Sequence, residues 1–570
     1  MIKQAGANQV SSDSKQGKDD EKAIAAREMW PRSMGAIAQF LFLGLILGIG
    51  YTQDPIYNSP ENQNTKYFHA FARAGHGFLS EDWLATTRDP LPAFTALVEW
   101  TYRFLHHEYV FYFYYILIFA LYIYSLMGIV AIIYPLKMPP LPLGNSPGQD
   151  QQSASTASLQ RASWLFLAFF FFIHIVHIEI FEVDIGWDLH AGVAMQYILG
   201  PVFQPANFGV FILLSILLFL RQRPFWAVGM LAIAVTFHPA YFPSVAALTG
   251  AYMVAQWWSH SRHAAHPWYQ PLILGLVATV LMLPVFLYMT LGFPDTTPEL
   301  AQRAKEIIVN ERIPHHSIPA VWLDGGEAYV QMAIVAIAIW LARKSTLAWI
   351  LAVPLVLATG LTWVQMLSGS ETLAFVAPWR MSVFLVPIGT SVLLGWGAIA
   401  LARVIPATRI ATRLTIGFSI IVMTAVVIGG GYEQVAKFQT QDETIPVMEV
   451  VQQTAQPGDL YLIPPNVRAW RKFRLRTGAA IFINRKSHPY IDTEVIEWSD
   501  RLTLAQQFYH TQPRGQQCRL LKRTLVKDYG VTHVIFPVDQ GQQACSGFEE
   551  VYQDEHYRLH QRQPRRSRGN

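Results

Sequence analysis

The sequence predicts a polytopic α-helical membrane protein with about 11 transmembrane helices and a small C-terminal α/β domain. The first observation is composition: 52% of the 570 residues are hydrophobic and only 14% are charged. Such a chain has too little polar surface for a soluble globular protein. The second observation is a series of long uncharged runs separated by short polar connections, which is typical of membrane helices.

The chain begins with a polar segment, residues 1–34, which is rich in Lys, Asp, Gln and Ser. It lacks the short apolar core and the small-residue cleavage site of a signal peptide. We therefore expect a disordered cytoplasmic tail. Residues 35–51 are uncharged and long enough to cross the hydrocarbon core, which needs roughly 17–25 residues, so they form the first predicted membrane helix.

Ten further apolar runs follow and complete a predicted transmembrane domain over residues 35–431. A Pro-, Gly-, Ser- and Gln-rich linker, 135–163, separates the second run from the third. The ten runs are 109–134, 164–181, 207–220, 225–237, 242–258, 271–291, 329–342, 346–366, 381–402 and 414–431.

Basic residues mark one side of the membrane. With the N-terminus inside, the cytoplasmic connections carry ten basic residues against one acidic residue, Asp150. The connection 182–206, on the opposite side, holds three acidic residues and no Lys or Arg. Because basic connections stay in the cytoplasm, the first long connection (52–108) and everything after residue 431 are expected on the outer, periplasmic side. The net charge of +4 gives no reason to expect nucleic-acid binding.

Several runs are too short for an ordinary crossing. The run 225–237 ends in His238-Pro239, where the proline breaks the helix. Freed backbone groups at membrane depth survive only inside protein or beside water, so this turn is expected to line a cavity reached from outside. The alternative is that His238 only caps a tight helical hairpin. The glycine and prolines of 186–206 similarly predict an irregular, partly re-entrant segment.

The segment 432–570 changes character. Its sequences GDLYLIPP and VTHVIFPV are typical of short buried strands, whereas 494–509 and 520–529 have helical spacing. This pattern predicts a small α/β domain with its own core. Both cysteines, Cys518 and Cys545, lie within it, and the sequence leaves open whether they form a disulfide. The domain's polar residues Arg474, Lys486, His488 and Tyr490 are candidates for closing over the membrane cavity.

The stretch 54–92 is the long polar insert among the early apolar runs. It carries five carboxylates, and we predict that Asp54, Asp82 and Asp89 are catalytic residues and that Glu61 and His76 bind substrate. Asp54 stands three residues beyond the first span and can face a lipid head group. The alternative is that Asp54 caps the following turn through Pro55.

The chain contains no Walker loop, no strand-bound GxGxxG, no HExxH and no GxSxG motif. Sugar transfer from a polyprenyl-phosphate-linked donor needs no nucleotide site, because a carboxylate can deprotonate the acceptor hydroxyl while cations hold the leaving phosphate. Arg380, at the outer end of the tenth span, is the predicted phosphate ligand, together with His238 as a substrate-binding residue. The alternative for Arg380 is an interfacial anchor beside Trp379.

The order of motifs in the first outer connection resembles that of the GT-C membrane glycosyltransferases, such as protein O-mannosyltransferases and lipid A aminoarabinose transferases. The matching residues are Asp54, Tyr67, Gly77-Phe78-Leu79, Asp82-Trp83 and Asp89-Pro90-Leu91-Pro92. Two positions depart from the pattern: Asp54-Pro55 replaces the usual Asp-Glu pair, and Asp89 replaces a basic or His residue. The resemblance implies a GT-C-like fold with sugar transfer on the outer side. Residues 473–498 are similar to the C-terminal part of a family of uncharacterised bacterial multi-pass membrane proteins.

Two other classes of function remain open: a non-catalytic GT-C relative, and a transporter or lipid-handling protein. The partners expected from the sequence are a lipid-linked sugar donor and membrane lipids. The cofactor is unknown, and a divalent metal ion is one possibility. A metal site near His174, His177 and His190 is one interpretation of the third span, although polar residues crowding a helix end are commoner there.

Overall fold

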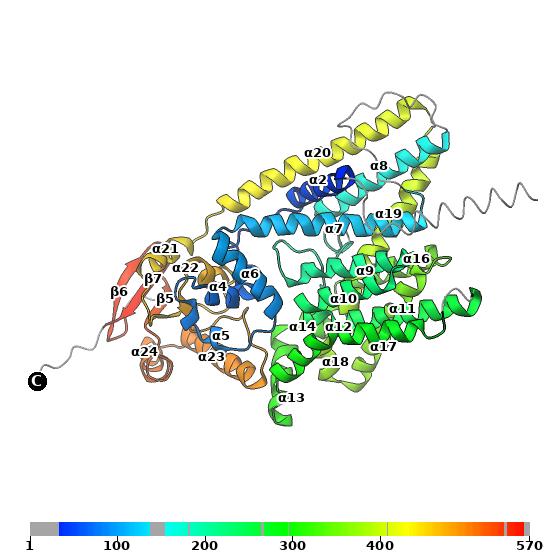
Figure 1. The fold of residues 1–570 in the computed structure, drawn as a ribbon. Helices are drawn as coiled ribbons and strands as arrows, with labels where there is room; N and C mark the ends of the chain where they lie inside the picture. The colour runs from blue at the N-terminus through cyan, green and yellow to red at the C-terminus, as the bar shows by residue number, and fades with distance from the viewer. Residues whose placement is uncertain are drawn as a thin grey trace, which may run out of the picture.

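The computed structural model describes residues 34–136, 154–180, 183–263, 267–294, 296–406, 408–540 and 544–563. The predicted tail before residue 34 and most of the predicted linker 135–163 lie outside this range. The described chain forms a helical bundle with a small sheet at one end, and the first long connection lies between the two (Figure 1).

Seven helical segments of the described chain are long and apolar enough to cross a membrane, and the bundle is therefore a multi-pass membrane fold. They are α2 (Met34–Tyr51), α7 (Tyr109–Ile133), α8 (Ala154–Ile175), α12 (Gln270–Gly292), α17 (Leu347–Ser368), α18 (Glu371–Val376) continued by α19 (Ser382–Val404), and α20 (Arg409–Gln439). Shorter or less apolar helices complete the bundle: α9 (Val210–Leu220), α10 (Pro224–Phe237), α11 (Phe242–His263) and α16 (Glu327–Leu341). How many of these shorter helices cross the membrane stays a prediction.

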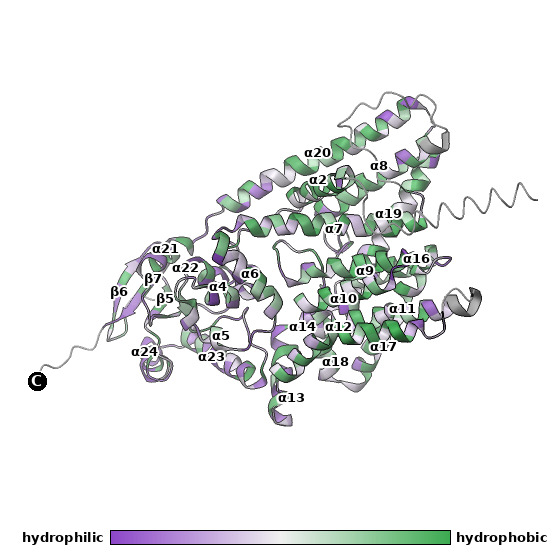
Figure 2. Cartoon of the chain, viewed as in Figure 1, coloured by the Kyte–Doolittle hydropathy of each residue, from purple (hydrophilic) through white to green (hydrophobic). Residues whose placement is uncertain are grey.

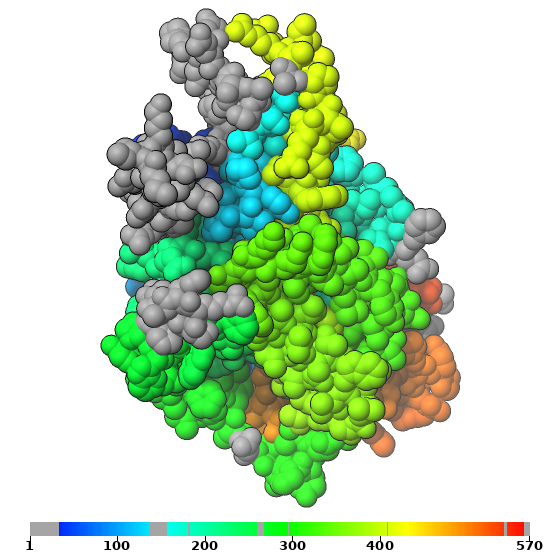
Figure 3. All heavy atoms as spheres, turned by 90° about the vertical axis from the view of Figure 1, so that its right-hand side faces the viewer, coloured from blue at the N-terminus to red at the C-terminus, as the bar shows by residue number. Residues whose placement is uncertain are grey.

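The bundle helices are apolar over most of their length, whereas polar residues gather at the sheet end (Figure 2). The apolar window of α7 is 61% buried but that of α12 only 17%, so α7 is central and α12 faces lipid. The packing of α2 on α7 requires a small residue, since a Cβ at Gly44 would lie 2.7 Å from the backbone nitrogen of Ala120. The opposite end of the bundle, seen in Figure 3, is formed mainly by helices from the middle of the chain.

The C-terminal region contains a five-stranded mixed sheet in the order β4-β3-β5-β7-β6. Strand β3 pairs in parallel with β4 and β5, and β7 pairs antiparallel with β5 and β6. The strands are β3 (Leu460–Leu462), β4 (Ala480–Ile481), β5 (His533–Pro537), β6 (Phe548–Gln553) and β7 (Tyr557–Arg562). The accompanying helices are α21 (Ile445–Thr454), α22 (Phe473–Thr477), α23 (Asp492–His510) and α24 (Arg514–Leu520), and a disulfide joins Cys518 to Cys545.

The first long connection folds into short helices that pack between the bundle and the sheet. They are α3 (Gln63–Lys66), α4 (Phe68–Ala74), α5 (Trp83–Thr86) and α6 (Pro92–Leu105). The backbone N–H of Phe78 donates to the carbonyl of Gly478 at 2.7 Å. A Cβ at Gly77 would lie 2.5 Å from that same oxygen, so only glycine permits the contact.

The core under the sheet also takes residues from the bundle side of the chain. Helix α13 (Pro298–Glu306) leads into a π-helical turn, η4 (Ile307–Arg312), whose Ile307 and Ile308 pack with the buried Trp498 and Phe482. The apolar core therefore extends beyond the predicted domain 432–570.

Two boundaries differ from those expected from sequence, and one irregular segment agrees with its prediction. Helix α20 continues to Gln439, because polar residues after Gly431 still fit a helix once it leaves the apolar region. Helix α8 begins at Ala154, inside the predicted linker. The segment from residue 185 to 204 holds turns and a single bridge rather than a helix, until η2 (Pro205–Gly209), and thus has the irregular form that its glycine and prolines predict.

Candidate functional site

The chemically richest part of the molecule lies between the bundle and the sheet. Four segments far apart in sequence supply cations to it: Lys66 at the end of α3, Arg312 at the end of η4, Arg380 in the 3-10 turn η5 (Pro378–Met381), and Lys486 after β4. We call these four residues the cation cluster. Its members come together only because the first connection and the C-terminal region both pack on the bundle.

The pKa of Tyr490 reflects the positive charge of the cation cluster. Burial raises the pKa of its phenol, but the charges of Lys66, Arg312 and Arg380, with a hydrogen bond from Lys66, outweigh that effect and leave the pKa below its usual value. A buried phenol becomes easier to ionise where nearby positive charges and hydrogen-bond donors outweigh the effect of burial. The surroundings of Tyr490 thus favour an anion.

Several donors of the cluster have no partner within the described chain. The Nε atoms of Arg312 and Arg380 are buried without a hydrogen bond, although Nη2 of Arg312 donates to the carbonyl of Lys486 at 3.0 Å. Burial, followed by the charges of Arg312 and Arg471, lowers the pKa of Lys486 to about 8. Because buried donors are nearly always satisfied in native proteins, these groups are available to a ligand.

Two carboxylates of the first connection, Asp54 and Glu61, lie within range of each other's charge. Asp54 follows α2 directly and forms an ion pair with Lys437, with 3.2 Å between Oδ1 and Nζ. Burial raises the pKa of Asp54, while Lys437 acts in the opposite direction. Glu61 forms an ion pair with Arg468. Both carboxylates are accordingly partly neutralised by a neighbouring cation.

Glu61 interacts electrostatically with both Asp54 and the cation cluster. Its charge acts on Asp54 on one side and on Lys486 on the other. Glu61 therefore interacts both with Asp54 and with Lys486 of the cation cluster, whereas no direct contact joins Asp54 to Arg380 among the described residues.

Asp82 lies at a different place from Asp54, and both oxygens of its carboxylate already accept hydrogen bonds from the protein. Its carboxylate accepts two hydrogen bonds from Arg474, at 2.7 and 2.8 Å, and one each from the backbone N–H groups of Leu84 and Ile481, both at 2.9 Å. Asp82 and Arg474 are both fully buried. These contacts are those of a residue that holds the first connection to the sheet.

Asp89 is also buried, and its Oδ1 accepts hydrogen bonds from Leu91 N–H at 2.9 Å and from Thr95 Oγ1 at 3.1 Å. Its Oδ2 lies 3.1 Å from Nη2 of Arg73. A polar cavity of about 320 Å³ borders Asp89 on the side of Arg88 and Glu494. Asp89 is thus placed beside the site but separated from Asp54.

The two predicted substrate-binding histidines differ in whether a ring nitrogen is left without a partner in the protein. His76 is engaged at both ring nitrogens, with Tyr102 Oη and with the carbonyl of Leu475, each at 2.8 Å. His238 has a buried Nδ1 without a partner and lies within the range of the charges of Lys66 and Arg380. The structure consequently brings His238, and not His76, to the cation cluster.

Sequence reasoning did not identify Lys66 and Arg312. Lys66 lies on the polar insert but was not distinguished from other surface lysines, and Arg312 lies in a polar connection between two apolar runs. No periodicity or motif marks either residue. Among the described residues, no group of three or more His, Cys, Asp or Glu side chains is placed to hold a metal ion, and this statement covers His174, His177 and His190.

The chain is similar to known proteins at two levels. Residues 442–505 match the family described as "Domain of unknown function (DUF6798)". The whole fold is similar to the crystal structure of ArnT from Cupriavidus metallidurans bound to undecaprenyl phosphate, at 11% sequence identity and a TM-score of 0.46, covering 93% of this chain and 98% of that chain. No curated protein sequence matches the chain.

These findings confirm the two resemblances expected from the sequence, to a GT-C-type glycosyltransferase and, in the C-terminal part, to an uncharacterised family. A TM-score of 0.46 leaves the two folds only broadly alike.

Proposed function

We propose that this protein transfers a sugar from a polyprenyl-phosphate-linked donor to an acceptor hydroxyl on the extracytoplasmic side of the membrane. The observation that carries the proposal is the cation cluster, in which the charges of Lys66, Arg312 and Arg380 act on Tyr490. Arg312 also donates to the carbonyl of Lys486, and the Nε atoms of Arg312 and Arg380 are buried without partners. Phosphate is the anion that such a cluster at a membrane surface fits best, since guanidinium groups bind its oxygens in pairs.

In this reaction the acceptor oxygen forms a bond to the anomeric carbon of the sugar, and the bond from that carbon to the phosphate oxygen breaks. The phosphate leaves with the electron pair and gains negative charge. Lys66, Arg312, Arg380 and Lys486 stabilise this charge, and they do so most strongly when the transition state is reached. Energy is already stored in the donor, so no nucleotide is required.

The proton of the acceptor hydroxyl passes to a carboxylate. Asp54 is the better candidate, because burial raises its pKa and thereby makes it a stronger base than an exposed aspartate. Glu61 lies between Asp54 and the cation cluster, and its ion pair with Arg468 suits a residue that orients the substrate. Asp54 is the proposed general base, with Glu61, His238 and Arg380 in binding roles.

The proposal is tested by binding first. The full chain in lipid nanodiscs is titrated with undecaprenyl phosphate and, separately, with the neutral alcohol undecaprenol. The phosphate is expected to bind at least about tenfold more tightly, since charge-assisted hydrogen bonds are the strong ones. Arg380→Gln is expected to remove most of that preference.

The matched control is Arg343→Gln. Arg343 follows α16, and its guanidinium lies over the ring of Trp340, 4.4 Å from the centroid and remote in sequence from the cluster. This variant should bind the phosphate like the unmodified protein. Equal affinity of the unmodified protein for the phosphate and the alcohol would exclude the cation cluster as a phosphate site.

A further inference from the structure

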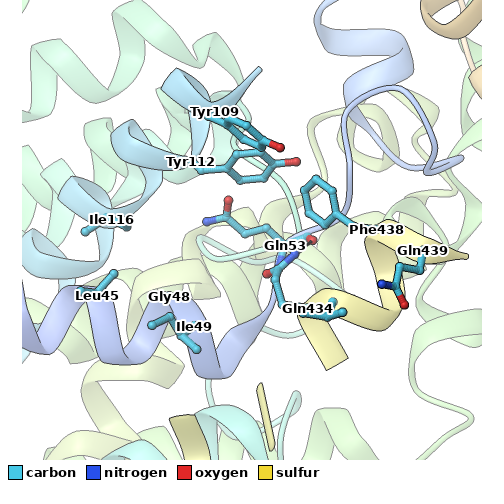
Figure 4. A pocket seen from close by; sticks show the side chains of 11 residues that line it. Leu45, Gly48, Ile49, Gln53, Tyr109, Tyr112, Ile116, Gln434, Phe438 and Gln439 are labelled. Atoms are coloured by element: carbon cyan, nitrogen blue, oxygen red, sulfur yellow. Dashed lines mark hydrogen bonds between the residues drawn. The ribbon is translucent and has the colours of Figure 1, made fainter. Parts of the chain in front are cut away.

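A second candidate binding site, an apolar groove, lies next to Asp54. An apolar groove of about 470 Å³ runs between α2, α7 and α20, and Figure 4 shows side chains from these three helices around it. Its walls are mostly apolar and include Leu45 and Gly48 of α2, Tyr109 of α7 and Val435 of α20, with Gln53 and Gln434 at one end.

The groove opens to the surroundings of the bundle. Leu45, Tyr109 and Val435 expose 40%, 60% and 55% of their surface on its walls. All three helices are long and apolar enough to cross a membrane. The groove faces lipid on the side of α2 and α7, and its α20 wall, residues 434–439, lies just beyond the apolar part of that helix. A hydrocarbon chain can enter it sideways from the bilayer.

One end of the groove is polar. Gln53 and Gln434 hold the two helices together there: the backbone N–H of Gln53 donates to Oε1 of Gln434 at 2.7 Å, and Nε2 of Gln434 donates to the carbonyl of Gln53 at 2.6 Å. The side-chain Oε1 of Gln53 has no hydrogen-bond partner, although only 4% of the residue is exposed. A buried acceptor of this kind calls for a donor from a ligand.

The charges at this polar end disfavour a phosphate. Asp54, Glu433 and Glu108 lie around it, and Lys437 is the cation that pairs with the first two, at 3.2 and 3.7 Å. Burial raises the pKa of Glu108, whose Oε2 accepts the N–H of Ile56 at 3.1 Å. A head group with a neutral hydroxyl is accommodated here, whereas an anionic one would be repelled.

We propose that this groove binds one hydrocarbon chain of a membrane lipid that carries a free hydroxyl, and that this hydroxyl donates to Gln53 and is presented to Asp54. The lipid is then the acceptor of the sugar, a role that depends on the function proposed above. In this arrangement the cation cluster selects the donor phosphate, and the uncharged Oε1 of Gln53 selects the acceptor hydroxyl. The two substrates reach Asp54 from different sides.

The groove is tested with a photo-crosslinkable diacylglycerol that carries a diazirine in one chain, added to the full protein in nanodiscs. Val435→Trp fills the groove and is expected to lower crosslinking to α2, α7 and α20 by at least about tenfold, because each buried methylene contributes to chain binding. Val280→Trp is the matched control, since Val280 on α12 is 59% exposed and lies outside the groove. Gly48→Leu fills the groove from the opposite wall. A loss of crosslinking in both variants is therefore not explained by misfolding of Val435→Trp alone.

The hydroxyl is tested with Gln53→Leu, which keeps the backbone hydrogen bonds to Gln434 but removes the unpartnered oxygen. The unmodified protein should prefer diacylglycerol to its 3-acetyl derivative, and Gln53→Leu should bind the two equally. Equal crosslinking in Val435→Trp and Val280→Trp would show that the groove does not bind the lipid chain. Equal binding of the two lipids by the unmodified protein would show that the free hydroxyl is not recognised. Undecaprenyl phosphate binding, measured in the same variants, should not change, so failure of the groove is distinguishable from failure of the phosphate site.

Discussion

At the scale of single residues, the site depends on charges that are poorly solvated. Lys486 shows this best, because its ammonium group is partly buried among other cations and its pKa is about 8. Arg312 and Arg380 are guanidinium groups and stay charged at any physiological pH. The pH response of the cation cluster should therefore come from Lys486.

Undecaprenyl phosphate binding should weaken as pH rises through 8. Lys486 is charged below its pKa and attracts the phosphate, whereas above it the neutral amine contributes no charge. The dissociation constant of the full protein, measured from pH 6.5 to 9.5, should rise by up to about tenfold per pH unit above 8. Lys486→Arg should abolish this rise, since arginine does not titrate in the range; an unchanged pH profile in that variant would assign the response to another group.

Asp54→Asn separates catalysis from binding. A general base contributes roughly 10²–10⁴-fold to a rate, so transfer should fall by about that factor while undecaprenyl phosphate binding stays near the unmodified value. Asn loses the ion pair with Lys437 but keeps the shape of the residue. If Asp54 only organises the following turn, Asn should replace it with little loss of activity, because Asn and Asp cap equally well.

At the scale of elements, two contacts in particular hold the first connection to the sheet. One is the fully buried pair of Asp82 and Arg474, and the other is the close approach of Gly77 to Gly478. The cation cluster takes Lys66 from the first connection and Lys486 from the segment after β4. The geometry of the cluster consequently depends on these two contacts, although neither lies within it.

The buried pair gives a prediction about stability. Removing one partner, as in Arg474→Met, leaves a buried carboxylate without its cation and should cost about 3–5 kcal/mol. Asp82→Leu with Arg474→Met should recover much of that loss, since no buried charge remains. Thermal unfolding of the single and double variants provides the measurement; a stable, folded Asp82→Leu protein lacking transfer activity would return Asp82 to the list of catalytic candidates.

At the scale of the whole molecule, orientation decides which chemistry is possible. Membrane location is supported by the apolar helices, whereas the sidedness of the termini rests on the distribution of Lys and Arg. The disulfide between Cys518 and Cys545 agrees with an oxidising compartment for the sheet. The outer face would then hold the sheet, the cation cluster and Asp54 together.

Reporter fusions test the orientation. An enzyme that is active only outside the cytoplasm should be active when fused after residue 440, just beyond α20, and inactive when fused within 135–163. The physical reason is the excess of ten basic residues over one acidic residue in the connections assigned to the cytoplasm. The reverse pattern would place the site inside and exclude a donor that is available only on the outer side.

The sequence alone determined the class of protein, because hydrophobic runs must be buried in lipid or protein wherever they occur. It also located the strands of the C-terminal region near residues 460 and 533, since alternating and β-branched runs act locally. It made Asp54 a candidate through its place beside a membrane helix and Arg380 a candidate through its place at a helix end, both of which are local properties.

Only the tertiary structure decided which polar residues meet. Lys66, Arg312, Arg380 and Lys486 are separated by tens to hundreds of positions, and their proximity depends on how four segments pack. Asp82 and Asp54 look alike in sequence, yet Asp82 is fully paired and buried, whereas Asp54 pairs with Lys437 next to a groove. The partners of a side chain are set by long-range packing, and no local pattern records them.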